Sequence, residues 1–169
     1  ELMGGALSQA GFPLIGVAMR QKSAAMDRFI NEYRRLVGMH IIYKTDVREM
    51  FRMMKDGWVV GLLADQDTNR HDGIVLDFFG RPTNCVPGPA TMARSAGIGL
   101  IPGYITRRKD GTHRIILHAP IEVPRTKDKR ADIRAAEQAV NRVLEQHIRE
   151  HPEEWFWLHD RWKSMRKES

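Results

Sequence analysis

Residues 58–67 read Trp58-Val59-Val60-Gly61-Leu62-Leu63-Ala64-Asp65-Gln66-Asp67, an uncharged apolar run that leads directly into two carboxylates. A continuous run of this kind is typical of a central strand, buried on both faces of a parallel sheet. The polar residues 65–73 that follow predict a loop at the carboxyl end of this strand. Ligand sites in open α/β sheets gather at this end of the strands, so the loop is the first candidate location for a site.

On the N-terminal side of this run, helical and strand periods alternate. Ser and Asp favour helix N-termini, and Gly favours the position after a helix. We therefore predict strands at 13–19 and 39–43, and helices at 1–10, between Ser23 and Gly38, and between Asp46 and Gly57. This alternation indicates an α/β layer fold.

The C-terminal side continues with elements of both kinds. We predict an extended segment at Ile74–Phe79, a loop at Gly80–Pro89 and a helix at 88–96. Two strands follow, Ile98–Arg107 and His113–Val123, joined by a turn at 109–112. The chain then continues with an amphipathic helix at 131–150 and a last helical segment from Pro152. No internal repeat and no domain boundary is visible, so residues 1–169 are predicted to form a single domain.

The chain is basic, with a formal net charge of +6 and a pI near 9.8. This charge favours an anionic partner such as nucleic acid, anionic lipid or an acidic carrier protein. No recognisable nucleic-acid-binding module is present, so nucleic acid is not expected. No run of 18 apolar residues exists that could span a bilayer. Cys85 is the only cysteine, which excludes a disulfide within the chain and a cysteine-based zinc site.

The Asp65-Gln66-Asp67 motif has two interpretations. The first is a D-x-D site that binds a divalent metal and a nucleotide-sugar diphosphate, as in a glycosyltransferase. The second is structural, with the carboxylates capping the following turn or pairing with Arg70. The sequence contains no G-x-S-x-G, P-loop or H-E-x-x-H motif, and the residues alone leave both interpretations open.

Aromatic and basic residues cluster twice downstream of this motif. Phe78-Phe79-Gly80-Arg81-Pro82 places two rings beside a turn, which suits either the wall of an apolar groove or core packing. Arg81 is either solvated or available to a phosphorylated or acidic substrate. Residues 151–163 hold three of the four tryptophans together with basic residues. That composition suits either a membrane interface or the docking of a last helix on the core.

Several segments, taken together, resemble one family. They are Val59–Asp67, Phe78–Thr83, Gly88-Pro89-Ala90, Ile101-Pro102, His151–His159 and Arg161-Trp162-Lys163. In order and spacing they are similar to the bacterial lipid A biosynthesis lauroyl/myristoyl acyltransferases of the glycerolipid acyltransferase superfamily. The resemblance implies an α/β fold with a mostly parallel central sheet flanked by helices. It also implies that the chain corresponds to the C-terminal two-thirds of the family's full length.

The same resemblance implies an activity. A fatty acyl chain would move from an acyl thioester to a hydroxyl of a lipid A precursor, at the cytoplasmic face of the bacterial inner membrane. Another glycolipid, such as a phosphatidylinositol mannoside, is the nearest alternative acceptor. The implied partners are an acidic acyl carrier protein as donor, a phosphorylated glycolipid and an anionic membrane surface. No metal and no cofactor is implied.

The superfamily is defined by the motif His-x-x-x-x-Asp/Glu. Glu1, with the small-residue helix after it, resembles the carboxylate of this motif. This implies that the motif histidine stands upstream, with four residues between it and Glu1, and that this chain alone lacks its base. The resemblance suggests that Arg20 contacts the glycolipid phosphate, and that the two aspartates lie near the headgroup or hold Arg20 or Arg70. The candidate substrate-binding residues are Arg20, Asp65, Asp67, Phe79, Gly80, Arg81 and Gly88.

Overall fold

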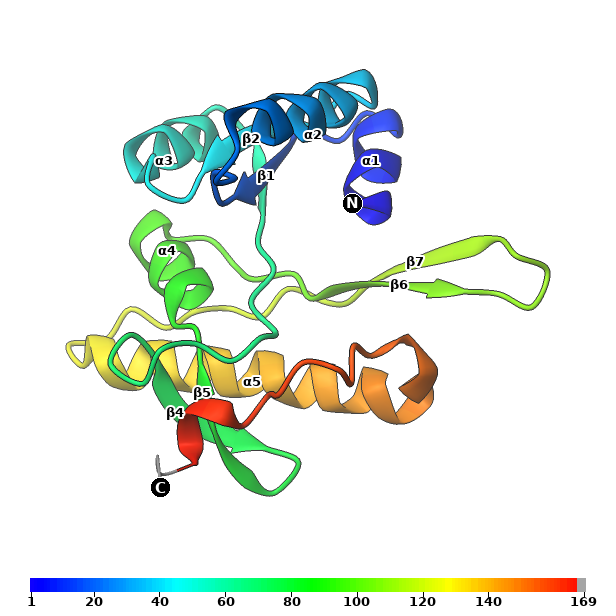
Figure 1. Cartoon of the computed structure of the whole chain (residues 1–169). Helices are drawn as coiled ribbons and strands as arrows, with labels where there is room; N and C mark the ends of the chain where they lie inside the picture. Colours follow the sequence, from blue (N-terminus) through cyan, green and yellow to red (C-terminus); the bar gives the residue numbers. More distant parts are fainter. Residues whose placement is uncertain (167–169) are drawn as a thin grey trace. The chain divides into compact units, whose positions relative to one another are not determined.

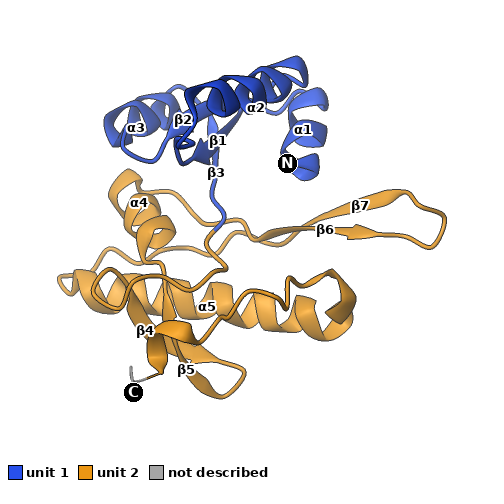
Figure 2. Cartoon of the chain, viewed as in Figure 1, with its two compact units in different colours: residues 1–63 blue, residues 64–169 orange. Residues whose placement is uncertain are grey.

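The computed structural model describes residues 1–166 (Figure 1). The chain divides into two compact units, residues 1–63 and residues 64–169 (Figure 2). That all 169 residues make a single acyltransferase domain stays a prediction. No helix among the described residues is long and apolar enough to cross a membrane.

The first unit is built around a three-stranded parallel sheet. Its elements are α1 (Leu2–Gln9), β1 (Leu14–Ala18), α2 (Ala24–Leu36), β2 (His40–Tyr43), α3 (Val47–Lys55) and β3 (Val59–Gly61). The strand order is β2-β1-β3, and Ile15 of β1 pairs with His40 on one side and Val60 on the other. The predicted strands and helices of this region are therefore confirmed.

The apolar run at 58–64 was predicted to be the central strand, and this prediction is wrong. Only Val59–Gly61 form a strand, and β3 lies at the edge of the sheet while β1 lies at its centre. Burial agrees with these positions: Ile15 of the central strand β1 is completely buried, whereas Val59 of the edge strand β3 is 47% exposed. An apolar run alone does not distinguish a central strand from an edge strand.

Local sequence explains the ends and the packing of these helices. The Ser23 hydroxyl accepts a hydrogen bond from the backbone N–H of Met26, as an N-cap does. A Cβ atom on Gly4 would lie 2.7 Å from the Met39 side chain, and one on Gly5 would lie 3.2 Å from Val37. The small residues of α1 therefore permit close packing against the segment that leads into β2.

The second unit combines two hairpins with two helices. Its elements are β4 (Ile74–Phe78), β5 (Arg81–Cys85), α4 (Gly88–Ala96), β6 (Gly103–Arg107), β7 (His113–Leu117), α5 (Lys129–Glu150), and the 3-10 turns Pro152–Glu154 and Lys163–Met165. Strands β4 and β5 are antiparallel, and so are β6 and β7. An α/β protein is thus confirmed. The only parallel sheet among the described residues has three strands, so a mostly parallel central sheet is not observed, and the superfamily fold stays a prediction.

Two further predictions for this unit are wrong. The segment Gly80–Pro89 was predicted to be a loop, yet it contains strand β5. Phe79 and Gly80 both have positive φ (55° and 72°), so they form the two-residue turn of a tight hairpin. The predicted last helix is instead two short 3-10 turns. Its Trp155 and Trp162 rings pack on the core cluster of Phe78, Leu144 and Ile148 rather than along one helix face.

Candidate functional site

In the first unit, the Glu1 carboxylate is held by an arginine of α2. The Nε atom of Arg34 donates to both carboxylate oxygens, at 3.0 and 3.2 Å, and its Nη2 donates to Oε1 as well. The Arg34 side chain is largely buried while Glu1 remains mostly exposed. Hydrogen bonding to Arg34, supported by its charge, lowers the pKa of Glu1 against the opposing effect of partial burial. The carboxylate is therefore ionised and oriented, and it stays accessible to a further hydrogen-bond donor.

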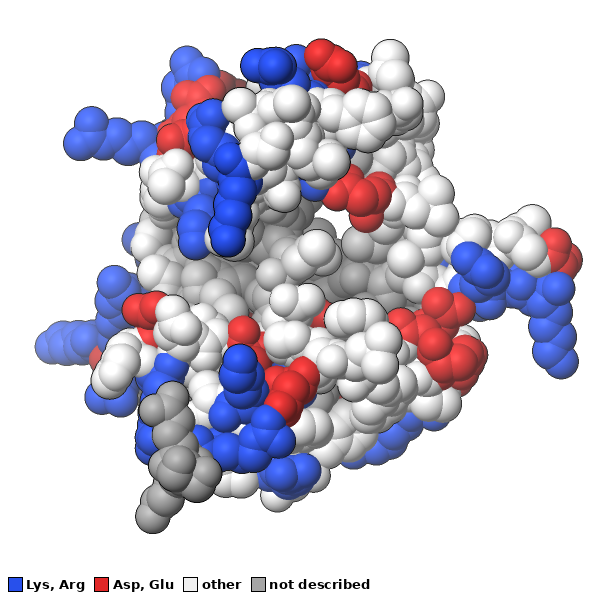
Figure 3. Space-filling view, in the orientation of Figure 1, with Lys and Arg blue, Asp and Glu red and all other residues white. Residues whose placement is uncertain are grey.

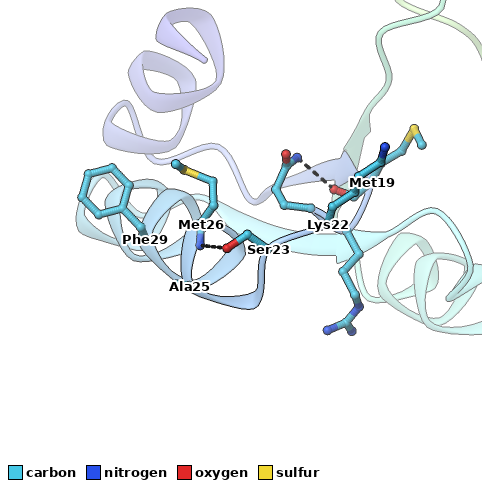
Figure 4. Close-up of a pocket in the computed structure, with 8 residues that line it drawn as sticks. Met19, Lys22, Ser23, Ala25, Met26 and Phe29 are labelled. Carbon is cyan, nitrogen blue, oxygen red and sulfur yellow. Dashed lines mark hydrogen bonds between the residues drawn. The ribbon is translucent and has the colours of Figure 1, made fainter.

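Arg20 follows β1 and lies beside an open hollow of the same unit. Its guanidinium stands 4.2 Å from the centre of the Tyr43 ring. The hollow has a volume of about 820 Å³, and Figure 4 shows the residues that line it. They are Met19, Arg20, Gln21, Lys22, Ser23, Ala25, Met26 and Phe29. A hollow with apolar and cationic sides suits an amphiphile with an anionic group.

The loop that carries Arg20 is fastened by a buried polar cluster that sequence reasoning missed. Asp27 of α2 accepts hydrogen bonds from the Tyr43 hydroxyl, from the backbone N–H of Gln21 at 2.8 Å and from the Asn31 amide. The bond from Tyr43 is the main reason that the pKa of Asp27 is lowered, and it raises the pKa of Tyr43 in turn. The available signal was Asp27 and Asn31, which stand four residues apart on one face of the predicted helix.

In the second unit, Asp67 binds the C-terminal segment. Its carboxylate accepts hydrogen bonds from the backbone N–H and the hydroxyl of Ser164, at 2.8 and 2.7 Å. Its backbone N–H donates to Nε2 of His159 at 2.8 Å, and Nη1 of Arg161 lies 3.9 Å from its Oδ1. The cation near Asp67 is therefore Arg161, whereas the predicted partners of the two aspartates were Arg20 or Arg70.

This geometry bears on the D-x-D interpretation. The Asp67 side chain is only 9% exposed, and both of its oxygens already accept hydrogen bonds from Ser164. Asp65 is half-buried and helps, after burial itself, to raise the pKa of Tyr104 to about 12. Within residues 1–166 no three histidine, cysteine, aspartate or glutamate side chains gather as metal ligands would. Asp67 thus holds the C-terminal segment, a contact that neither interpretation of the motif predicted.

Arg161 is the buried centre of this arrangement, and sequence reasoning gave it no role of its own. Its side chain is 2% exposed, and its Nη1 donates to the backbone oxygen of Asn84 at 2.6 Å. The Asn84 amide in turn donates to the backbone oxygens of Thr68 and Asn69. The loop after residue 64, strand β5 and the C-terminal segment are therefore connected through two polar side chains. Arg161 stands within the Arg161-Trp162-Lys163 block of the family resemblance, which was the one available signal.

The remaining predicted residues have identifiable structural surroundings. The backbone N–H of Phe79 donates to Oε1 of Glu145, and the guanidinium of Arg149 stands 4.8 Å from the Phe79 ring. Arg81 is exposed, with its guanidinium 4.6 Å from the Trp162 ring. Gly88 begins α4. The structure thus brings Phe79, Gly80 and Arg81 together at one hairpin, and their contact with a substrate stays a prediction.

The sheet of the first unit, with an ionised glutamate oriented by Arg34, defines an α/β protein with a candidate acid–base site. The sequence matches the family described as bacterial lipid A biosynthesis acyltransferase over residues 1–164. The chain belongs to this family.

The curated relatives include acyltransferases named for two different glycolipids. The chain is 27% identical over 158 residues to the phosphatidylinositol mannoside acyltransferase of Mycobacterium tuberculosis, covering 90% of the chain and 48% of that protein. It is 26% identical over 153 residues to the lipid A biosynthesis lauroyltransferase of Escherichia coli, covering 90% and 49%. The lipid A biosynthesis acyltransferase of Haemophilus influenzae is 23% identical over 155 residues. The chain spans about half the length of these relatives, a smaller share than the two-thirds that the resemblance implied.

Proposed function

We propose that this protein is an O-acyltransferase that moves a fatty acyl chain from an acyl thioester to a hydroxyl of a lipid A precursor. The family match over residues 1–164 carries the proposal. The carboxylate of Glu1, which Arg34 holds, supports it, because we take this residue as the acidic member of the family's motif. In this proposal the histidine of the motif precedes Glu1, with four residues between the two.

The chemistry proposed for Glu1 is that of the carboxylate in a His-x-x-x-x-Glu motif. An ionised carboxylate accepts a hydrogen bond from one imidazole nitrogen, which fixes the tautomer and stabilises the imidazolium that forms later. The other nitrogen takes the proton of the acceptor hydroxyl as its oxygen attacks the thioester carbonyl. The tetrahedral intermediate then collapses and the C–S bond breaks. The imidazolium returns its proton to the sulfur, which leaves as the free thiol. Arg34 keeps the carboxylate ionised and limits its rotation.

The proposed partners are anionic. The acceptor is a phosphorylated glycolipid, whose phosphate Arg20 would contact, and the donor is an acidic acyl carrier protein. Lys and Arg side chains project from both units on the face that Figure 3 shows, and the net charge is +6. A positive surface of this kind raises the rate of encounter with both partners. The proposed location is the cytoplasmic face of the bacterial inner membrane.

A second acceptor has its own support. The phosphatidylinositol mannoside acyltransferases of two mycobacterial species match 27–28% of residues over about nine-tenths of the chain, slightly more than the lipid A enzymes do. The same base and the same thioester chemistry would serve a mannose hydroxyl. Acyl transfer to such a mannoside is therefore the second candidate function.

Both candidates are tested by one acyl-transfer assay. The chain, extended upstream to include the motif histidine, is given labelled acyl carrier protein or acyl coenzyme A with either glycolipid acceptor. We expect transfer by the extended chain alone, reduced on the order of 10²-fold or more by Glu1→Ala. Glu49→Ala is the matched control, because Glu49 is a partly exposed glutamate that also pairs with an arginine, and it should leave activity unchanged.

The same assay distinguishes the remaining alternative. If the extended chain transfers no acyl group from any donor, yet binds a nucleotide sugar only when Mg²⁺ or Mn²⁺ is present, acyl transfer is rejected in favour of the D-x-D interpretation. Insensitivity to chelators together with dependence on Glu1 supports the proposed dyad.

A further inference from the structure

Helix α2 exposes a continuous apolar stripe. Met26, Phe29, Tyr33 and Leu36 stand three or four residues apart and are 49%, 54%, 59% and 78% exposed. Spacing of this kind places them on one side of a helix, and Figure 4 shows Met26 and Phe29 projecting together. The Phe29 and Tyr33 rings touch, with their centres 4.8 Å apart. We define these four residues as the α2 stripe.

The stripe is not the face by which α2 packs on its own unit. The buried residues of this helix are Asp27 and Asn31, whose polar groups bond to Tyr43 and Gln21. An amphipathic helix ordinarily buries its apolar side against the core. Here the polar side is buried and the apolar side faces outward, which is the arrangement of a helix that meets an apolar phase outside its own unit.

Basic side chains lie at the N-terminal end of the stripe and on another side of α2. Arg20 and Lys22 lie in the hollow at the N-terminal end of α2, next to Met19, which is 63% exposed. Arg28 and Arg35 are exposed on the helix itself. None of these four side chains forms a salt bridge within the described part of the chain, where Glu32 is the only exposed acid on α2. Apolar residues with basic neighbours are what an interfacial helix presents to an anionic bilayer.

We propose that the α2 stripe, with the adjoining hollow, is the surface by which this protein docks on a membrane that contains anionic lipid. The stripe would lie in the headgroup region with Phe29 and Leu36 in the acyl boundary, and Arg20 and Lys22 would meet lipid phosphates. The inference rests on the proposed function, because a glycolipid acceptor is delivered at such a surface. It assigns membrane contact to α2 rather than to the tryptophan-rich segment 151–163.

The test uses vesicles without acyl donor or glycolipid acceptor, so that binding is measured independently of acyl transfer. The 169-residue chain is cosedimented with phosphatidylcholine vesicles that contain or lack phosphatidylglycerol. Phe29→Ser/Leu36→Ser removes two exposed apolar side chains of the stripe. Phe156→Ser/Leu158→Ser is the matched control, since these residues are 58% and 88% exposed in the second unit. Circular dichroism checks that each variant folds.

We expect at least tenfold weaker partitioning for the stripe variant and a change below twofold for its control. The charge-reversal variant Lys22→Glu/Arg28→Glu should weaken binding to the anionic vesicles more than tenfold. Arg108→Glu/Lys109→Glu makes the same change in net charge at an exposed turn, and it should weaken that binding much less.

Several outcomes overturn the proposal. They are an absence of vesicle binding, equal loss in stripe and control variants, and equal binding to vesicles with and without phosphatidylglycerol. A stripe variant that changes the sedimentation coefficient without changing vesicle binding would identify a self-association surface instead. Intact stripe-dependent binding in a protein that fails every acyl-transfer assay supports the docking surface while rejecting the proposed function.

Discussion

At the scale of single residues, Arg161 shows how a buried charge is stabilised. Its guanidinium bonds to Asn84 and Cys85, stands 5.5 Å from the Phe78 ring, and has the Asp67 carboxylate nearby. A desolvated guanidinium persists only where acceptors and an opposite charge replace water. Its removal would leave the carboxylate of Asp67 without its cation and the backbone oxygen of Asn84 without a donor.

Arg161→Met is therefore expected to lower the free energy of unfolding by about 3 kcal/mol, as for a broken buried pair. Arg81→Met is the matched control, because Arg81 also lies over an aromatic ring but is exposed, and its loss should cost under about 0.5 kcal/mol. Urea unfolding followed by tryptophan fluorescence measures both. Equal stability of the two variants would contradict the role assigned to Arg161.

Glu137 is a buried acid whose charge is costly. Its Oε1 accepts a hydrogen bond from the backbone N–H of Ala90 at 2.8 Å, near the start of α4. Burial raises the pKa of Glu137 from 4.5 to about 7 against the effect of that hydrogen bond. The folded protein therefore holds this proton more tightly than the unfolded chain, so stability is lost as the pH rises from about 4.5 to 7.

Glu137→Gln keeps an acceptor for Ala90 and removes the ionisation. We expect the variant to be more stable than the parent by about 1–3 kcal/mol at pH 8, with the difference shrinking toward pH 4.5. Denaturant unfolding across that pH range checks it. A constant difference between parent and variant would show that Glu137 does not titrate in this window.

At the scale of elements, a group of rings surrounds the C-terminal end of α5. His147 stacks on Tyr104 of β6 with ring centres 4.1 Å apart, and His118 and His151 stand near. Burial, followed by repulsion from these two histidines, lowers the pKa of His147 below its usual 6.5, although Glu150 and Glu154 oppose the shift. A histidine held neutral contributes stability above its unfolded pKa that is lost as the pH falls through the folded one.

Acidification below pH 6.5 should therefore loosen the packing of α5 on β6. His147→Gln removes the titrating ring, so its unfolding free energy should depend less on pH below 6.5 than that of the parent. His113→Gln, at an exposed position of β7, is the control and should leave the pH dependence unchanged. An unaltered pH dependence in His147→Gln would contradict this assignment.

The elements of the first unit could be predicted from the sequence because each is encoded locally. Ser23 and Gly38 flank helix α2, and the apolar runs coincide with the strands. Strand β5 could not be predicted, because it contains Pro82 and buries the polar Asn84. The Asn84 amide donates hydrogen bonds to the backbone oxygens of Thr68 and Asn69, which are distant in the sequence. The local pattern of apolar and polar residues therefore gives no sign that Asn84 is buried. Tertiary bonds outweigh strand propensity at such a position.

The candidate site follows the same division. The location of Asp67 in a loop after an apolar run was predicted correctly, since strand and loop are adjacent in the chain. Its partners His159, Arg161 and Ser164 lie more than 90 residues away, and spacing does not reveal such pairs. Arg34 was also missed as the partner of Glu1, because an arginine late in a basic helix is ordinarily read as solvated.

At the scale of the whole molecule, the boundary between the two units falls at an exposed leucine. Leu63 ends the first unit and is 90% exposed, between β3 and the loop of Asp65 and Asp67. Proteases cut where an extended backbone is accessible and free of sheet hydrogen bonds. A protease that cleaves on the amino side of leucine, such as thermolysin, should therefore cut between Leu62 and Leu63 early and release fragments corresponding to residues 1–62 and 63–169.

Leu158 provides the comparison within the same chain. It is 88% exposed, so a cut there is also expected. Because Leu63 and Leu158 are almost equally exposed, side-chain exposure alone does not favour either cut. Leu63→Ser should abolish the fragments of the unit boundary and leave the cut at Leu158, whereas Leu158→Ser should do the reverse. Mass spectrometry of the early digest identifies both cuts. If Leu158 is cut and Leu63 is not, residues 62–65 are protected from the protease and the boundary between the units does not behave as an accessible linker.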